Sequence, residues 1–291
     1  MEYCYILILS LFICSCVSKQ TDRIEQFYET VNLTVSDSIY SDKELPMGPV
    51  LSIKSWRNVL ILSHHSDNYR FSFIDSRTGR LVARWGEKGN SPSEFIDFGS
   101  DFFVQDSLLI FQSSMKKTMN YISIPAIALV KTESYPYTAD FRPLQIMPMG
   151  EKKVATGLFS HGVLGLLDEN NQIVGTFSCD LDGLYRGTVY QLILSCNVHK
   201  KRLLVSVSHS DVFEIYELQA NGLQRVYVNN FSRVPIVKMQ DGRLDIDDSQ
   251  SIGGILSMFN TEDLFYLGYS NSGLVEVARK DYMFDEILCF D

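Results

Sequence analysis

Short apolar or alternating segments, each followed by turn-forming residues, dominate the chain from residue 50 onward. The first four are Val50–Ile53, Val59–Ser63, Arg70–Ile74 and Arg80–Trp85. Segments of this length that are rich in Val, Ile, Phe and Leu, and bounded by Ser, Asp, Asn and Gly, are typical of β-strands. The turn Asp75–Gly79 is the clearest hairpin signal, because glycine adopts the positive φ that such loops need. We therefore predict a four-stranded antiparallel meander.

The same group of four segments recurs three more times along the chain. The expected strands are Asp101–Val104, Leu108–Gln112, Asn120–Ile124 and Ile127–Lys131, then Leu144–Met147, Lys153–Leu158, Val163–Leu167 and Ile173–Phe177, then Tyr190–Leu194, Arg202–Ser206, Val212–Glu217 and Leu223–Val228. The third strands of successive groups are 49, 44 and 49 residues apart, measured at Phe73, Ile122, Leu166 and Ile215. A period of about 40–50 residues is typical of propeller blades. The pattern predicts an all-β fold, a β-propeller of four-stranded antiparallel blades.

A fifth group of strands is incomplete. Its strands are expected at Ile255–Met258, Asp263–Tyr269 and Glu286–Phe290, with Val234–Gln250 as an extra segment inserted before them. No fourth strand follows before Asp291. The fifth blade would therefore have an unpaired edge, which natural sheets usually cover or pair.

The amino-terminal segment has the hydrophobic pattern of a secretory signal that ends at a cysteine. The apolar run Tyr5–Ser15 precedes Cys16, and the polar stretch Val17–Arg23 follows it. An apolar core of about 7–15 residues before small residues is typical of a signal peptide, and the cysteine at the cleavage position resembles the lipobox of bacterial lipoproteins. A transmembrane anchor is the alternative, but it needs about 20 apolar residues. We predict that Cys16 is lipidated and becomes the first residue of a membrane-anchored protein.

These patterns divide the chain into three parts. Residues 1–15 are the lipoprotein signal peptide, residues 16–48 are the lipid anchor, a polar tether and a strand at Leu33–Val35, and residues 49–291 are the propeller. The strand at Leu33–Val35 would pair with the last blade and close the ring. The expected location is the cell envelope, with the lipid in the outer membrane and the body facing the periplasm or the cell surface.

The segment that joins the first two strand groups, Arg80–Phe95, carries a recognisable pattern. Five residues match Arg/Lys-x-Gly-x-x-Gly-x-x-Pro-x-Glu-Phe/Tyr, namely Gly86, Gly89, Pro92, Glu94 and Phe95, whereas Ser91 and Ser93 stand where glycine is usual. The pattern resembles the connector of TolB-like six-bladed β-propeller lipoproteins of Gram-negative gut anaerobes. The final Glu286–Asp291 is similar to a late-blade motif of that family. The resemblance implies a six-bladed fold with about five blades present, either truncated at the carboxyl end, which we expect, or naturally short.

The net charge bears on nucleic-acid binding, and the number and spacing of the cysteines bear on disulfides and metal sites. The formal net charge of −9 argues against a nucleic-acid partner, because binding a phosphate backbone requires clustered Lys and Arg. Of the six cysteines, three would remain in the body, at Cys179, Cys196 and Cys289. Their spacing fits neither a metal site nor a disulfide framework. Buried thiols are expected, with a Cys179–Cys196 disulfide as the alternative.

The candidate chemical residues lie in predicted turns. His64 and His65 follow the second strand of the first group, His161 that of the third, and His209 with Asp211 that of the fourth. Equivalent blade positions would bring these side chains to one rim, where His and Asp act as metal ligands or acid–base groups. Solvated hairpin turns contain the same residue types. We therefore expect no metal or cofactor, and retain His64, His65, His209 and Asp211 as catalytic candidates.

Two other short segments have simpler interpretations. Gly86–Gly89 lacks the spacing of a Walker or dinucleotide-binding loop, so its glycines are expected to shape the turn between blades. The acidic run Asp245–Ser249 lacks the spacing of a calcium loop and is expected to be a solvated loop.

No nucleophile, base and orienting group can be assembled from these motifs. We therefore expect a non-catalytic binding or scaffold module for an envelope protein or a glycan. A lyase or hydrolase that uses the rim histidines is the alternative, since propellers host both kinds of function.

Overall fold

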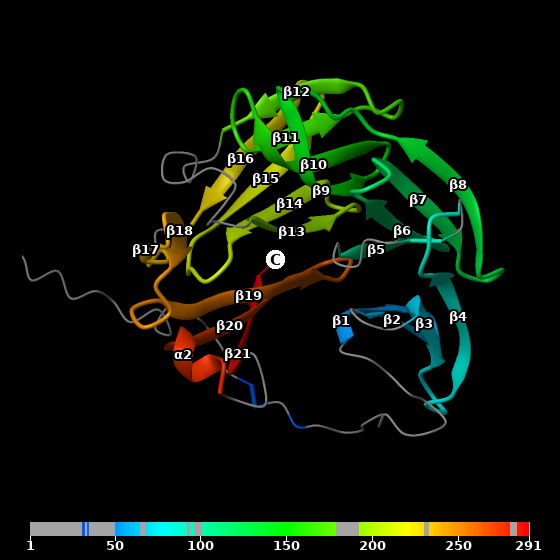
Figure 1. The fold of residues 1–291 in the computed structure, drawn as a ribbon, viewed down its shortest axis with the longest axis horizontal. Coiled ribbons are helices and arrows are strands. Elements are labelled where there is room, and N and C mark those ends of the chain that lie inside the picture. Colours follow the sequence, from blue (N-terminus) through cyan, green and yellow to red (C-terminus); the bar gives the residue numbers. More distant parts are fainter. Residues whose placement is uncertain are drawn as a thin grey trace, which may run out of the picture. The chain divides into compact units, whose positions relative to one another are not determined.

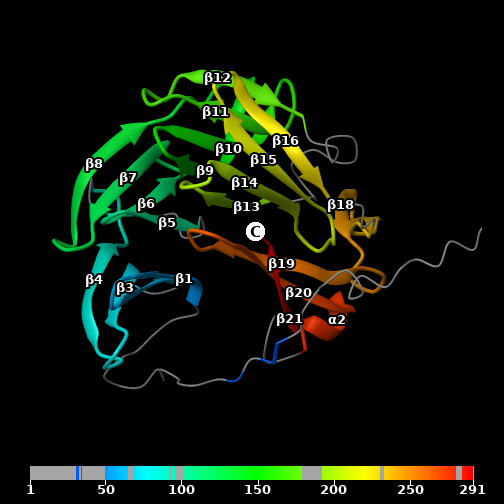
Figure 2. The ribbon, with the colours of Figure 1, turned by 180° about the vertical axis from the view of Figure 1, so that it is seen from behind.

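The fold is described from a computed structural model, which covers residues 31–32, 34, 50–64, 68–91, 94–95, 101–178, 192–229, 233–279 and 284–290. The chain divides into two compact units, Met1–Ser38 and Ile39–Asp291. The described part of the second unit is a β-propeller of five antiparallel blades (Figure 1 and Figure 2). Its described helix is the single turn α2, Leu274–Val277. The predicted fold class is confirmed.

Four blades are four-stranded sheets whose strands follow chain order. Their strands are β1 (Val50–Trp56), β2 (Val59–His64), β3 (Tyr69–Asp75) and β4 (Leu81–Glu87); β5 (Phe102–Gln105), β6 (Leu108–Ser113), β7 (Thr118–Ser123) and β8 (Ala128–Ser134); β9 (Phe141–Met149), β10 (Lys152–Phe159), β11 (Leu164–Leu167) and β12 (Ile173–Phe177); and β13 (Leu192–Asn197), β14 (Arg202–Val207), β15 (Phe213–Gln219) and β16 (Gly222–Val228). Every predicted strand of these four groups overlaps an observed one. The predicted strand at Leu33–Val35 has both of its end residues outside the described part of the chain.

The fifth blade has three strands among the described residues, β19 (Ile252–Asn260), β20 (Phe265–Gly273) and β21 (Glu286–Phe290). Among the described residues of this blade, β21 pairs with β20, and all three predicted strands of the fifth group overlap observed ones. Cys289 on this strand is exposed, so the expectation of a buried thiol is wrong at this position. Residues along β21 alternate between two faces, and Cys289 lies on the solvent-facing side while Leu288 is buried on the other. Cys196 is partly buried with a free thiol, and Cys179 lies outside the described residues.

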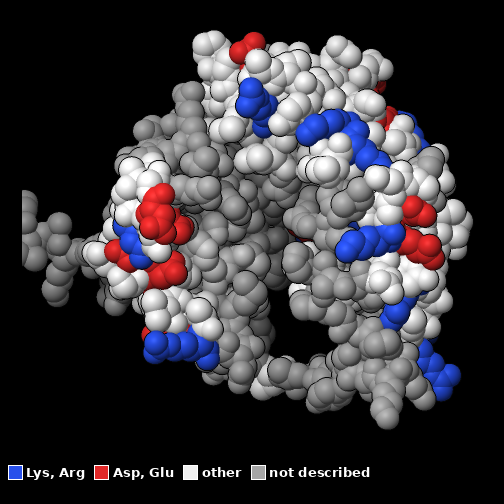
Figure 3. All heavy atoms as spheres, in the orientation of Figure 1, with Lys and Arg blue, Asp and Glu red and all other residues white. Residues whose placement is uncertain are grey.

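The inserted segment before the fifth blade forms a separate two-stranded hairpin, β17 (Val237–Gln240) with β18 (Arg243–Ile246). Its two turn residues, Asp241 and Gly242, have φ of 50° and 75°, as a type I′ turn requires. The expected loop at Asp245–Ser249 is therefore wrong in part, since its first two residues belong to β18. Figure 3 shows acidic side chains gathered over this hairpin.

The carboxylate of Asp247 organises the base of the hairpin. It accepts hydrogen bonds from Ser249 Oγ at 2.7 Å and Gln250 Nε2 at 2.8 Å, and it lies 3.4 Å from Lys238 Nζ. The hydrogen bond from the Ser249 side chain is the main cause of the lowered pKa of Asp247. The oxygens of this carboxylate are thus already bonded to side chains of the same hairpin and the turn that follows it.

The hydrophobic core is divided among the interfaces between successive blades. One cluster joins the first two blades around Phe71 and Phe111, a second joins the next pair around Phe141 and Ile146, and a third joins the third and fourth blades around Val154. The middle strands of each blade are buried over nearly their whole length, as in β3 and β10, because neighbouring blades cover both of their faces. The outer strand β8 instead alternates toward solvent.

The connector between the first two blades is fixed by its own residues. Gly86 has φ of 78°, and a Cβ there would lie 3.1 Å from the Arg70 Cβ. The Glu94 carboxylate accepts the Ser91 N–H at 3.0 Å, and Lys116 Nζ donates to the carbonyl oxygens of Ser91 at 2.5 Å and Glu94 at 2.7 Å. Phe95 is fully buried between the blades. The expectation that Gly86 shapes this turn is confirmed.

Arg233 links the fourth blade to the fifth. Its Nε donates to Asp211 Oδ2 and its two terminal nitrogens donate to Asn271 Oδ1 and Tyr269 Oη, all at 2.7 Å. Its backbone N–H donates to Asp211 Oδ1 at 2.8 Å. The side chain of Asp211 is 3% exposed, so the Arg233 guanidinium compensates the buried negative charge of this carboxylate.

Replacing Arg233 by Met should lower the free energy of unfolding by about 2 kcal/mol. Removing one partner of a buried ion pair costs roughly 3–5 kcal/mol, and the solvent that reaches the exposed part of Arg233 reduces this cost. Urea denaturation followed by circular dichroism measures the change. Arg279→Met at an exposed site is the control, with an expected change within about 0.5 kcal/mol. Equal losses in both variants would rule out the linking role.

Candidate functional site

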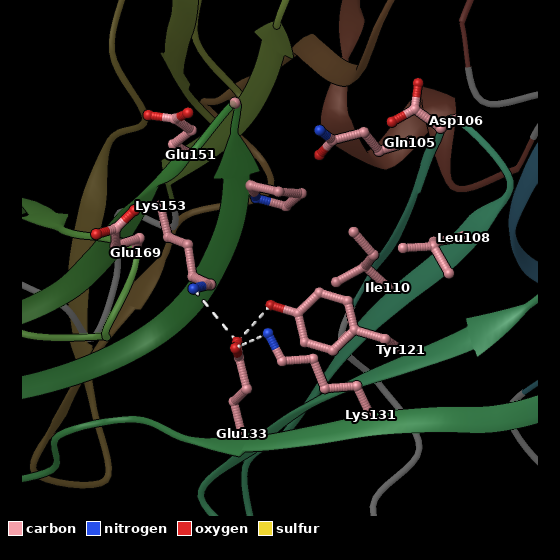
Figure 4. A pocket seen from close by; sticks show the side chains of 12 residues that line it. Gln105, Asp106, Leu108, Ile110, Tyr121, Lys131, Glu133, Glu151, Lys153 and Glu169 are labelled. Carbon is pink, nitrogen blue, oxygen red and sulfur yellow. Dashed lines mark hydrogen bonds and ion pairs between the residues drawn. The ribbon is translucent and has the colours of Figure 1, made fainter.

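A cavity of about 250 Å³ lies between the second and third blades (Figure 4). Leu108 and Ile110 on β6 and Pro148 on β9 form its apolar wall, together with the ring of Tyr121 on β7. Its opening is surrounded by the turns β5–β6, β9–β10 and β11–β12, which share one end of the blades because the strands alternate in direction.

Glu133 on β8 is the centre of a polar network in this cavity. Its Oε2 accepts a hydrogen bond from Tyr121 Oη at 2.7 Å and lies 3.3 Å from Lys153 Nζ, while its Oε1 pairs with Lys131 (Figure 4). Tyr121 faces Lys131 directly across the β7–β8 ladder, so the register places the phenol and the ammonium side by side. Lys153 reaches the same carboxylate from β10 of the next blade, where it is 6% exposed.

The network holds Glu133 ionised and Tyr121 protonated. Burial raises the pKa of Glu133, but hydrogen bonds from Lys131 and Tyr121 and the charges of Lys153 and Lys131 outweigh it and lower the pKa to about 2. Burial, followed by the hydrogen bond to Glu133, raises the pKa of Tyr121 well above its ordinary value. Neither group exchanges a proton near neutral pH, so the network supplies fixed charges and hydrogen-bonding groups.

Three exposed carboxylates stand around the opening. Asp106 lies in the β5–β6 turn, Glu151 in the β9–β10 turn and Glu169 in the β11–β12 turn (Figure 4). None of the three forms an ion pair with another described residue, whereas Glu133 at the inner end has two lysine partners. The cavity therefore combines a buried Lys153–Glu133 ion pair at its inner end with a negatively charged rim.

The structure places the histidine candidates away from this cavity. His64 is the last residue of β2, and His161 and His209 lie in the turns between the second and third strands of their blades; all three are at the opposite strand ends from the cavity. His64 is buried, with Nε2 2.8 Å from Ser72 Oγ, and His161 is exposed. His65 lies outside the described residues.

His209 and Asp211 share one turn, but their side chains have different partners. The Nδ1 atom of His209 lies 3.2 Å from the Gly253 carbonyl oxygen, whereas Asp211 binds Arg233. Within the described ranges, no three His, Cys, Asp or Glu side chains are grouped closely enough to hold a metal ion. The described histidines stay dispersed over the first, third and fourth blades.

Sequence analysis did not identify the cavity residues. Tyr121, Glu133 and Lys153 are on different strands of two blades, and no motif connects them. The available signal is Lys153, a charged residue at the start of the largely apolar strand β10.

No protein-family model matches this sequence, and no curated protein matches it significantly. Solved structures do resemble the fold. A Bacteroides fragilis protein described as exported superposes with a TM-score of 0.57 at 13% identity, over 79% of this chain and 68% of that protein. A DUF4221 family member from Bacteroides vulgatus superposes with a TM-score of 0.53 at 7% identity, over 86% of this chain and 80% of that protein. At these identities the likeness concerns the propeller fold.

Proposed function

We propose that this chain is an envelope lipoprotein of the TolB-like six-bladed type, whose propeller is a non-catalytic binding or scaffold module for a protein or a glycan. The signal-like run before Cys16 and the matched connector Arg80–Phe95 support the family and the lipid anchor. An extracytoplasmic location also agrees with the exported Bacteroides fragilis protein of similar fold. No helix in the described part of the chain is long and apolar enough to cross a bilayer.

The dispersion of the candidate acid–base residues is the observation that carries the non-catalytic role: the described histidines lie in the first, third and fourth blades, and Asp211 binds Arg233 rather than His209. General acid–base catalysis requires a group with a pKa near the working pH. The described groups with a displaced pKa all move away from neutrality: it is lowered for the carboxylates of Asp75, Glu94, Glu133 and Asp247 and raised for Tyr121, Cys196 and Arg233. These seven groups therefore keep one protonation state near neutral pH and add no acid–base group to the dispersed histidines.

Replacing Cys16 by Ser should release the protein from the membrane fraction without altering the thermal unfolding of the body, because acyl chains contribute about 0.8 kcal/mol per buried CH₂ to membrane binding. Fractionation of cells fed labelled palmitate measures both location and acylation. Cys14→Ser is the matched control and should stay membrane-bound. Labelled lipid in the Cys16→Ser variant would disprove the anchor.

The binding role has a separate test. The Cys16→Ser protein, immobilised and exposed to envelope extract, should retain a protein or glycan, and the His64→Gln/His65→Gln/His209→Gln variant should retain it equally. If the retained molecule is instead cleaved, and cleavage stops in the triple variant, the enzyme alternative replaces this proposal.

A further inference from the structure

We infer that the cavity between the second and third blades binds one neutral sugar residue of a glycan. This inference rests on the proposed function and specifies the ligand of that module. It is carried by the lining of the cavity, which combines a buried hydrogen-bond donor, an apolar wall and exposed carboxylates at the rim (Figure 4).

The donor is Lys153. An ammonium group carries three N–H donors, and among the described residues Lys153 Nζ pairs with Glu133. Lys153 is 6% exposed and lines the cavity, so a ligand oxygen placed there gains a charge-assisted hydrogen bond.

The acceptors are the carboxylates of Asp106, Glu151 and Glu169 at the rim. All three lie in exposed turns without an ion-pair partner among the described residues, so their oxygens are available to accept hydrogen bonds. A hydroxyl group both donates and accepts. A polyhydroxylated ligand therefore offers acceptors to the inner ammonium and donors to the rim carboxylates.

Charged ligands match this lining less well. A cation would meet the Lys153 ammonium at the inner end, and an anion would meet the rim carboxylates and a chain of net charge −9. The apolar wall of Leu108, Ile110 and Pro148 suits the C–H face of a sugar ring. The volume of about 250 Å³ is below the roughly 300–1,000 Å³ of pockets for drug-sized ligands, which favours a single sugar residue.

Calorimetric titration of the full chain tests this inference, with the methyl glycosides of glucose, galactose, mannose and N-acetylglucosamine as probes. At least one glycoside should bind with a Kd of about 1 mM, as expected for a ligand of this size. The Asp106→Asn/Glu151→Gln/Glu169→Gln variant should bind it at least about tenfold more weakly, since three charged acceptors become neutral. Glu262→Gln, which changes a carboxylate that is 81% exposed outside the cavity, should bind normally.

Two results in which a small molecule binds would overturn the inference. One is binding of Nα-acetyl-lysine methylamide, but of no glycoside, with loss in the rim variant. The other is glycoside binding that the rim variant leaves unchanged while its thermal unfolding matches wild type. If no glycoside binds while an envelope component is still retained without turnover, this inference fails and the proposed function stands. Turnover of that component would reject the proposed function itself.

Discussion

Replacing Phe111 by Ala should lower the free energy of unfolding by about 3–5 kcal/mol, the usual cost of emptying a buried phenylalanine site. The Phe111 ring is fully buried. Its centroid lies 5.3 Å from that of Phe71, 5.9 Å from Trp85 and 4.9 Å from Phe95, all near edge-on. The Arg70 guanidinium lies 4.5 Å from the same centroid. The Phe111 ring, on the second blade, thus contacts the first blade and the connector. The strands on both sides are rigid, so they cannot move in to fill the void that the Ala substitution leaves.

Chemical denaturation of the Phe111→Ala protein measures this loss. Phe259→Ala is the matched control, because Phe259 also stacks on an aromatic ring, that of Tyr266 at 4.8 Å, but is 39% exposed. The control should lose about 1 kcal/mol or less. Similar losses at both positions would show that burial of Phe111 between the first two blades adds no stability beyond that of a partly exposed aromatic pair.

The Glu133→Gln variant should be destabilised by roughly 2 kcal/mol at neutral pH, because solvent screening lowers the usual cost of breaking a buried ion pair. Gln keeps the shape of the side chain but leaves Lys153, whose side chain is 7% exposed, without its counter-ion. Tyr121 retains a hydrogen-bond acceptor, so the loss reports mainly the buried ammonium.

The same substitution should change the pH dependence of stability. The folded-state pKa of Glu133 is lowered from 4.5 to about 2, so its stabilising contribution is complete above pH 4.5 and disappears as the pH falls toward 2. Solvent screening reduces that contribution to about 1–2 kcal/mol. Wild type should lose this amount between pH 5 and about pH 2, and Glu133→Gln should not.

Urea denaturation over that pH range, with Glu262→Gln as the exposed control, gives both quantities. The control should retain the wild-type slope of stability against pH. An identical slope for Glu133→Gln would mean that Glu133 is not held ionised by its lysine partners.

The strands were predictable because their signals are local. β12 coincides with the predicted Ile173–Phe177, and Asp75–Gly79 connects β3 to β4 as expected. β9 was predicted too short, at Leu144–Met147 against Phe141–Met149, because proline is rare inside strands. Here Pro143 is tolerated because it faces Gly157 next to a register shift.

One missed element had a local signal. Asp241–Gly242 is a strong hairpin dipeptide, but the flanking segments are short and carry charged residues at Lys238 and Asp245. The polarity of these segments is more typical of a loop than of strands. In the structure, β17 and β18 pair with each other outside the blades, so each strand satisfies the backbone hydrogen-bonding groups of the other.

The sequence by itself determined the number and order of the described blades. Side-chain alternation, turn residues and a repeat of 44 to 49 residues depend only on nearby positions along the chain. Tertiary structure alone decided which charged groups meet. Lys153 reaches Glu133 from the next blade and Arg233 binds Asp211 22 positions earlier, while the histidines stay apart. These pairings depend on how one blade packs against another, and the separation of two residues in the sequence does not predict that packing.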